Sequence, residues 1–369
     1  MNVSPRTAAL ATVSALSIAV LASATASAQE PVLSPPAALL SVEQYETPVD
    51  GWNGWLVWSR RGGDGRYALI ARTPTGEGLS LPVTPQTAPI DASIGPGPDG
   101  QPLIVYSQCS SPGLQPTGCD IHRLSPITGN GGRVKAASRP DREERFPTVW
   151  GSKIAFSMSL GKGPARAGVA VVDIDGPAPK RPTVYGAQTE RIGGKTVPVR
   201  SYGPRGIDLR GGRLAFSWQA QGRSDQWSLL TTNVAKGVTR QLIAARSTSS
   251  VVSQVGRPAV GPKDVIVPVL RTGGANISEI VRSNFNGRQQ WTLQGGFSAA
   301  QTERYGSALT AVARTDDRDL VIVRRLASDG RWACMAASST ASGCELLRYA
   351  DATNAWTRLT RASTGTSRR

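Results

Sequence analysis

Six short apolar runs, spaced about 50 residues apart, constrain the fold of this chain more than any other feature. They begin at Leu56, Ile104, Ile154, Leu214, Val265 and Leu320. A short apolar run between Gly- and Pro-rich turns is typical of a strand buried on both faces. This period matches four-stranded propeller blades. The sequence therefore predicts an all-β, six-bladed β-propeller of four-stranded antiparallel blades over 42–361.

Within each apolar run, one large residue is expected to fill the space between neighbouring blades. These residues are Trp58, Tyr106, Phe156, Phe216, Val267 and Val323. Ring closure has two interpretations. In the first, Val42–Thr47 is the inner strand of blade one and every blade is continuous in sequence. In the second, residues 37–45 pair with blade six as a latch.

The amino-terminal segment has the pattern of an export signal. Arg6 is followed by an apolar run and by Ala26-Ser27-Ala28, which predicts a signal peptide over 1–28 and a mature start at Gln29. The alternative is an uncleaved anchor. No later stretch is apolar enough to span a bilayer, and no cysteine precedes Cys109, which excludes a lipidated cysteine. We expect a flexible lead-in over 29–41, a disordered tail over 362–369, and a periplasmic, envelope or secreted location.

The chain is strongly basic, with a formal net charge of +16. An intracellular chain of this charge would suggest nucleic acid, but export and the absence of a basic run exclude that class of partner. Either the charge attracts an acidic partner or an anionic envelope polymer, or it is a solvated surface of scattered arginines.

The four cysteines form two local pairs with identical spacing, Cys109 with Cys119 and Cys334 with Cys344. Exported chains favour disulfides. Equal spacing at two similar places in a repeat favours these two pairings over the other connectivities. The spacing does not match a zinc site, so we expect no metal and no cofactor.

One turn and its following strand carry a family resemblance. The turn Gly97-Pro98-Asp99-Gly100 and the strand Gln101–Tyr106 resemble the PD40 repeat, a WD40-like repeat of TolB-type propellers. The next two units have Gly151-Ser152 and Gly211-Gly212 at the turn. The resemblance implies a six-bladed propeller that binds peptide segments at its central channel. We expect no counterpart of the α/β domain that precedes the propeller in TolB proteins.

Few residues suggest catalysis. His122 is the only histidine, and no Gly-x-Ser-x-Gly turn is present, which argues against a hydrolase triad. A glycoside hydrolase would need only two carboxylates, for which Asp91, Asp208 and Glu303 are candidates. Each of them could equally cap a turn or pair with an arginine.

Three arginines, Arg145, Arg205 and Arg257, stand a similar distance before the apolar runs of blades three to five. Asp91 has the matching place in blade two. This place opens the innermost strand, so the arginines are expected at one channel mouth, where they would bind a carboxylate, phosphate or sulfate. The predicted ligand-binding set is Asp91, Arg145, Arg205, Asp208, Arg257 and Arg304. The alternative is that nearby acids neutralise each arginine.

The favoured interpretation is a monomeric, non-enzymatic binding module for a peptide or an anionic partner. The first alternative is a glycoside hydrolase with paired carboxylates in the axial pocket. The second is a structural envelope protein, which predicts a plugged channel with no pocket.

Overall fold

The computed structural model describes most of the chain from residue 49 onward. The described ranges are 33–34, 49–62, 64–112, 117–159, 167–179, 183–186, 189–192, 195–198, 201–220, 226–243, 251–272, 277–287, 289–294, 307–315, 319–326, 343–350 and 355–358. Every regular element in these ranges is a β-strand. Within them no helix could cross a membrane.

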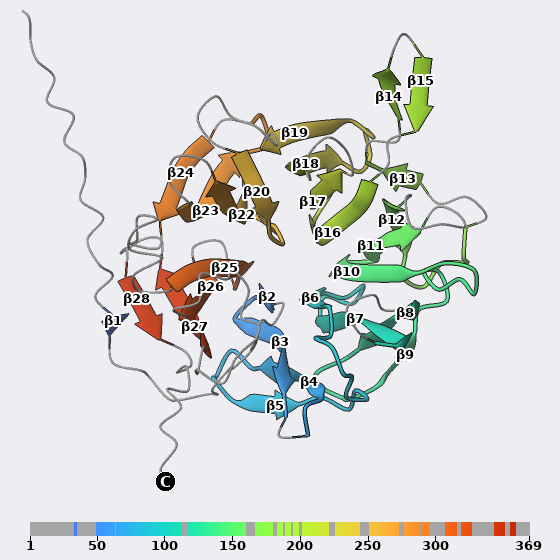
Figure 1. Cartoon of the computed structure of the whole chain (residues 1–369). Coiled ribbons are helices and arrows are strands. Elements are labelled where there is room, and N and C mark those ends of the chain that lie inside the picture. Colours follow the sequence, from blue (N-terminus) through green and yellow to red (C-terminus); the bar gives the residue numbers. More distant parts are fainter. Residues whose placement is uncertain are drawn as a thin grey trace, which may run out of the picture.

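The strands form antiparallel sheets arranged around a central axis, which is a β-propeller (Figure 1). Blade one contains β2 (Val49–Trp52), β3 (Trp55–Arg61), β4 (Tyr67–Arg72) and β5 (Gly78–Ser80). Blade two contains β6 (Ala92–Pro96), β7 (Pro102–Ser111), β8 (Thr117–Leu124) and β9 (Gly131–Arg133). Blade three contains β10 (Glu144–Trp150), β11 (Lys153–Ser159), β12 (Ala167–Asp173) and β13 (Thr183–Tyr185).

The later sheets follow the same order. Blade four contains β16 (Ser201–Arg210), β17 (Arg213–Ala220), β18 (Gln226–Asn233) and β19 (Thr239–Ile243). Blade five contains β20 (Val251–Val255), β21 (Ala259–Val260), β22 (Asp264–Thr272), β23 (Ile277–Asn284) and β24 (Gln289–Gln294). Both β20 and β21 pair with β22, so the inner strand of this blade is interrupted.

A further sheet lies between blade five and blade one. It contains β25 (Ser307–Arg314), β26 (Asp319–Leu326), β27 (Gly343–Ala350) and β28 (Ala355–Arg358), and β1 (Leu33–Ser34) joins its outer edge in parallel with β28. In this sheet, side chains are described only for 311–315. The structure therefore describes side-chain packing within five blades, one fewer than the six that the sequence predicts.

The turn between the first two strands shows why these residues form hairpins. Trp52 pairs directly with Trp55, which leaves Asn53-Gly54 as a two-residue loop. Both loop residues have positive φ, 47° and 81°. Asn and Gly tolerate this conformation, and it matches the twist of the flanking strands. The backbone N–H of Gly54 also donates to the Thr315 carbonyl, which joins blade one to the last sheet.

The cores lie between neighbouring blades, as the apolar runs predict. Trp58, Phe156, Phe216 and Val267 are buried. Trp58 packs with Ala311 and Ala313 of β25, whereas Phe156 belongs to a cluster that contains residues of blades two and three. Each large side chain thus closes the gap to the preceding blade, and stacking of the sheets supplies the apolar burial that a single sheet lacks.

The ends of the propeller differ in part from the expectation. The inner strand of blade one is β2, whereas Val42–Thr47 lies outside the described residues. The expected latch at 37–45 also lies outside them. Within the predicted flexible lead-in, however, Leu33 and Ser34 pair with Trp356 and Thr357 of β28. An amino-terminal segment therefore adds a short strand to the last sheet, at its outer edge.

Two further elements were not expected from the apolar repeat. The strands β14 (Thr189–Ile192) and β15 (Lys195–Pro198) form a separate two-stranded hairpin between blades three and four (Figure 1). Their residues are mostly polar, and the segment lacks the apolar run that marks a blade strand.

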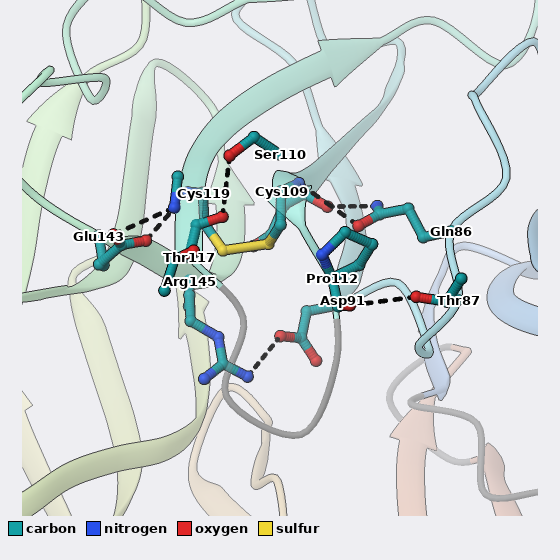
Figure 2. The surroundings of a disulfide bond; sticks show 12 residues. Gln86, Thr87, Asp91, Cys109, Ser110, Pro112, Thr117, Cys119, Glu143 and Arg145 are labelled. Atoms are coloured by element: carbon teal, nitrogen blue, oxygen red, sulfur yellow. Dashed lines mark hydrogen bonds and ion pairs between the residues drawn. A yellow bond between two sulfur atoms is a disulfide. The ribbon is translucent and has the colours of Figure 1, made fainter.

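The first of the two expected disulfides is present. Cys109 on β7 lies directly opposite Cys119 on β8, and their sulfur atoms are bonded (Figure 2). The bond therefore joins two strands of one blade. The Glu143 carboxylate accepts hydrogen bonds from the backbone N–H groups of Gly118 and Cys119, which ties this hairpin to blade three. Cys334 lies outside the described residues, so the pairing with Cys344 stays a prediction.

Candidate functional site

Four polar side chains occupy equivalent positions on consecutive inner strands. They are Asp50 on β2, Ser93 on β6, Thr148 on β10 and Asp208 on β16. Each pairs with the second residue of its blade's apolar run, namely Val57, Val105, Ala155 and Ala215. Because equivalent positions on the inner strands of a propeller lie at one height along the axis, these four side chains form a single layer, which we call the axial belt.

Hydrogen bonds connect the axial belt across blade boundaries. The Ser93 hydroxyl donates to the Asp50 carboxylate and lies 3.3 Å from the Thr148 hydroxyl oxygen. The Thr148 hydroxyl donates to Asp208 at 3.1 Å. Asp208 also accepts from the backbone N–H groups of Leu209 and Val260. The belt therefore links blades one to five through buried polar contacts in place of an apolar axis.

Arg257 crosses the channel beside this belt. It follows β20 in blade five, yet its guanidinium donates to the Ala92 carbonyl in blade two and to the Asp50 carboxylate, 3.3 Å away. The side chain is mostly buried, with 14% exposed, and that of Asp50 is 9% exposed. A cation that reaches from blade five to blades one and two spans the axis.

Burial shifts the pKa values of Asp208 and Asp91. Burial raises the pKa of Asp208 to about 7, and the neighbouring Asp50 carboxylate adds to the shift, while Arg257 opposes it. Burial also raises the pKa of Asp91, against the opposing charges of Arg145 and Arg257. Arg257 therefore opposes the effect of burial at Asp208 and, together with Arg145, at Asp91.

A cavity of about 780 Å³ lies on the other side of the belt residues Asp50 and Asp208, toward the ends of the inner strands. Its walls come from β2, β6, β10, β16, β21 and β25. The lining residues are Asp50, Gly51, Trp52, Asn53, Ile94, Val149, Trp150, Asp208, Leu209, Arg210, Val260, Arg314 and Thr315. This volume falls within the range of small-molecule and short-peptide sites.

Two glycines allow the inner strands to approach each other closely around this cavity. A Cβ atom at Gly95 would lie 2.3 Å from the Val149 carbonyl oxygen, and one at Gly51 would lie 2.8 Å from the Arg314 carbonyl oxygen. Any larger residue at these two positions would force the strands apart. Gly51 and Gly95 therefore set the width of the channel next to the belt.

The cavity combines acidic, aromatic and basic side chains. The Arg210 guanidinium carbon lies 5.1 Å from the centroid of the Trp150 ring, which is a cation–π distance. Arg314 is buried and pairs with Asp264, and Arg282 pairs with the same carboxylate. Arg314, which lines the cavity, thus shares the Asp264 carboxylate with Arg282.

The predicted arginines do not line this cavity. Arg145 lies 3.7 Å from the Asp91 carboxylate (Figure 2). Its guanidinium carbon lies 4.6 Å from the centroid of the Phe146 ring. Arg205 is exposed and donates to the Gln219 side chain at 3.1 Å. Of the predicted ligand-binding set, Asp208 lies in the cavity wall. Arg304 and the candidate acid Glu303 lie outside the described residues.

The three arginines share a backbone feature. The pairing register shifts between Arg145 and Thr148, and between Pro204 and Gly206, where Arg205 is the extra residue. In blade five, Arg257 lies in the break between β20 and β21. Phe146 has a φ of 51°, which is a strained conformation for an aromatic residue. β-Bulges redirect the side chains that they carry, and Arg205, at such a bulge, is exposed. Arg257, in the break between two strands, turns toward the axis.

The surroundings of His122 are typical of a packed side chain. It lies on β8, partly buried, with its ring centroid 5.5 Å from that of Tyr106. Burial lowers its pKa, against the opposing charge of Asp120. Among the described residues, no group of three or more His, Cys, Asp or Glu side chains could hold a metal ion.

Sequence reasoning missed Asp50, Trp52, Trp150, Arg210 and Arg314. A pattern in the sequence could have identified Asp50, Trp52, Trp150 and Arg210. Asp50, Ser93, Thr148 and Asp208 are four polar residues at one register, and Trp52, Trp150 and Arg210 lie two residues after the belt positions of their strands. Alignment of the units on the apolar run places all of them on the channel. The predicted arginines stand near the starts of the inner strands, whereas the cavity lies toward the ends of these strands, at the opposite mouth of the channel.

No protein-family model matches the chain, and no curated protein matches it. The TolB of Acinetobacter baumannii is a structural neighbour with 14% identity and a TM-score of 0.42, over 67% of this chain and 54% of that one. The putative TolB of Agrobacterium tumefaciens has 12% identity and a TM-score of 0.46, over 77% and 84%. A puromycin hydrolase has 14% identity and a TM-score of 0.47, over 90% and 57%.

This chain therefore spans about half the length of the Acinetobacter TolB.

Proposed function

We propose that the protein is an exported β-propeller that binds a peptide segment of a partner in the axial cavity. The observation that carries this proposal is the cavity of about 780 Å³, with walls from the inner strands of the ring. Trp52 and Trp150 supply aromatic surface, and Arg210 and Asn53 supply hydrogen-bond donors. Aromatic and arginine side chains dominate the energetics of protein recognition sites, which favours a binding role.

The surroundings of Asp50 and Asp208 favour a binding site over a catalytic site. Asp50 and Asp208 both line the cavity, which is the arrangement that a glycoside hydrolase would need. However, both oxygens of Asp208 accept hydrogen bonds from the chain, from Thr148 and Leu209 on one side and from Val260 on the other. A general acid must present its oxygen to the substrate. These bonds favour a structural role for Asp208.

The same proposal includes closure of the ring as six units. The sheet β25–β28 would be the last blade, with β25 as its inner strand beside β2. Support comes from the hydrogen bond between Gly54 and Thr315, from the packing of Trp58 against Ala311 and Ala313, and from Arg314 in the cavity wall. β1 would then strengthen the outer edge of that blade.

Aromatic substitutions test the binding site. We expect Trp52→Ala and Trp150→Ala to weaken binding of an immobilised random hexapeptide library by roughly ten-fold each, because each removes an aromatic wall of the cavity. The matched control is Trp55→Ala, in the same hairpin as Trp52 but outside the cavity. Bound peptide is measured by mass spectrometry, and thermal unfolding verifies the fold of each variant.

A parallel screen of glycans for hydrolysis by the pure protein tests the enzyme alternative. We expect no turnover above that of an Asp208→Asn variant. Unchanged peptide binding in both tryptophan variants, or glycan turnover that Asp208→Asn abolishes, would contradict the proposed function.

A further inference from the structure

Asp50 belongs both to the axial belt and to the lining of the cavity, and its two carboxylate oxygens have unequal surroundings. Oδ2 accepts hydrogen bonds from the Ser93 hydroxyl, from the Ile94 backbone N–H at 3.0 Å and from the Arg257 guanidinium at 3.3 Å. Within the part of the chain that the structure describes, Oδ1 accepts none. The side chain is 9% exposed and lines the cavity, so Oδ1 is the acceptor that remains for a ligand.

An oxygen of this kind favours a ligand that carries a hydrogen-bond donor. A carboxylate oxygen that has lost its water keeps the cost of desolvation until a donor contacts it. Donors that carry a positive charge form the shortest and strongest bonds to a carboxylate. The ligand group that satisfies Oδ1 best is therefore a cationic N–H donor.

The aromatic side chains of the cavity favour the same kind of group. Trp52 lies two residues after Asp50 on β2, so the two side chains lie on one face of the strand. Trp150, on β10, also lines the cavity. The faces of indole rings attract ammonium groups and also pack against the aliphatic carbons attached to them.

The arginines that line the cavity differ from Oδ1 of Asp50, because both already have partners within the chain. The Arg210 guanidinium lies over the Trp150 ring, and Arg314 pairs with Asp264. These cations are therefore engaged by groups of the protein, whereas Oδ1 is not.

From this arrangement we infer that the cavity recognises a primary amine of its peptide ligand, which in its protonated form donates a hydrogen bond to Oδ1 of Asp50. This inference rests on the proposed function and names the chemistry of that site. The carbon atoms next to the amine contact the rings of Trp52 and Trp150.

Two sources could supply this amine, the amino terminus of the peptide or a lysine side chain. The experiment uses four hexapeptide libraries that are immobilised through their carboxyl ends and carry no other charged residue. The first has a free amino terminus and no lysine, the second has an acetylated terminus and one lysine, and the third has an acetylated terminus and no lysine. The fourth has a trimethylated amino terminus and one trimethyllysine, so it keeps positive charge without an N–H donor on either group.

We expect the third library to bind about ten-fold more weakly than the first, the second or both, because it lacks the charge-assisted hydrogen bond. The first two libraries identify the source of the amine. The fourth should bind about as weakly as the third, because positive charge alone does not satisfy Oδ1.

A substitution of Asp50 tests the atom that the inference names. In Asp50→Asn, we expect the preference for an amine to disappear, because the asparagine oxygen would take the donors of Oδ2 and an N–H donor would replace Oδ1. The matched control is Asp120→Asn, which removes a carboxylate that pairs with Arg133, outside the cavity. Thermal unfolding verifies the fold of both variants, and the four libraries on the native protein decide the inference if Asp50→Asn does not fold.

Three results would overturn the amine inference and leave peptide binding intact. They are equal binding of the first three libraries, binding of the fourth as strong as that of the first or second, and the same amine preference in Asp50→Asn and Asp120→Asn. Failure of every library to bind would overturn the proposed function itself.

Discussion

Glu144 is an acidic residue in buried surroundings that disfavour its charged form. It opens β10 opposite Met158, and its side chain is fully buried. Burial raises its pKa to about 8, against the partial opposing effect of the Arg139 backbone, and the neighbouring carboxylates Asp120 and Glu143 raise it further. The native protein therefore keeps a proton on Glu144 at neutral pH, whereas the unfolded chain releases it.

This raised pKa predicts a pH-dependent stability. The contribution of Glu144 is fully present below its ordinary pKa, near 4.5, and is lost as the pH rises through about 8. We expect Glu144→Gln to raise the thermal midpoint relative to the native protein at pH 8 and to change it little at pH 4. Unfolding followed by circular dichroism at both pH values measures this difference.

The control for this prediction is Glu77→Gln, which changes an exposed carboxylate in blade one. Its effect should be small at both pH values. A Glu144→Gln protein that is less stable than the native protein at pH 8 would show that the buried carboxylate is ionised and paired.

At the scale of the element, apolar composition marks the middle strands of the blades but not the inner strands. Runs such as Leu56–Ser59 and Ile154–Ser157 are apolar on both faces, so their burial follows from composition. Inner strands line a polar channel and carry Gly51, Gly95 and the axial belt. Their pattern therefore matches neither a half-buried strand nor a core strand, and β2 lies outside the range predicted for it.

Local backbone geometry, including β-bulges, explains why the arginines do not lie where the sequence predicts them. Spacing along the chain places Arg145, Arg205 and Arg257 at equivalent points. However, the residues beside them differ, with Phe146-Pro147, Pro204 and Pro258. The backbone differs as well, because Arg145 and Arg205 lie at β-bulges whereas Arg257 lies between β20 and β21. The direction of a bulged side chain depends on local backbone geometry, which spacing does not encode. Spacing in the sequence therefore does not show which of these arginines reaches the axis, nor that none of them lines the cavity.

At the scale of the whole molecule, Arg257 connects blades that are far apart in sequence. Its pair with Asp50 joins blade five to blade one inside the channel. Removing one partner of a buried ion pair leaves an uncompensated charge, whereas replacing both partners removes this cost. A double-mutant cycle can measure the interaction of this pair. Each single variant leaves one buried charge without its partner, whereas the double variant leaves neither charge.

We expect Arg257→Met to lower the free energy of unfolding by about 3–5 kcal/mol, because Asp50 is then buried without its cation. In Asp50→Asn with Arg257→Met, we expect a smaller loss than the sum of the two single changes. Urea unfolding of the four proteins measures this coupling. Additive losses would show that Arg257 and Asp50 do not interact in solution.

The central claim is that a peptide binds in the axial cavity, at the mouth flanked by Trp52 and Trp150. The most direct measurement is photo-crosslinking of a bound hexapeptide that carries one photoreactive side chain, with the attachment sites located by mass spectrometry. The account predicts crosslinks to Trp52, Asn53, Trp150 or Arg210. Crosslinks confined to the outer strands, or to the opposite mouth around Arg205, would contradict it.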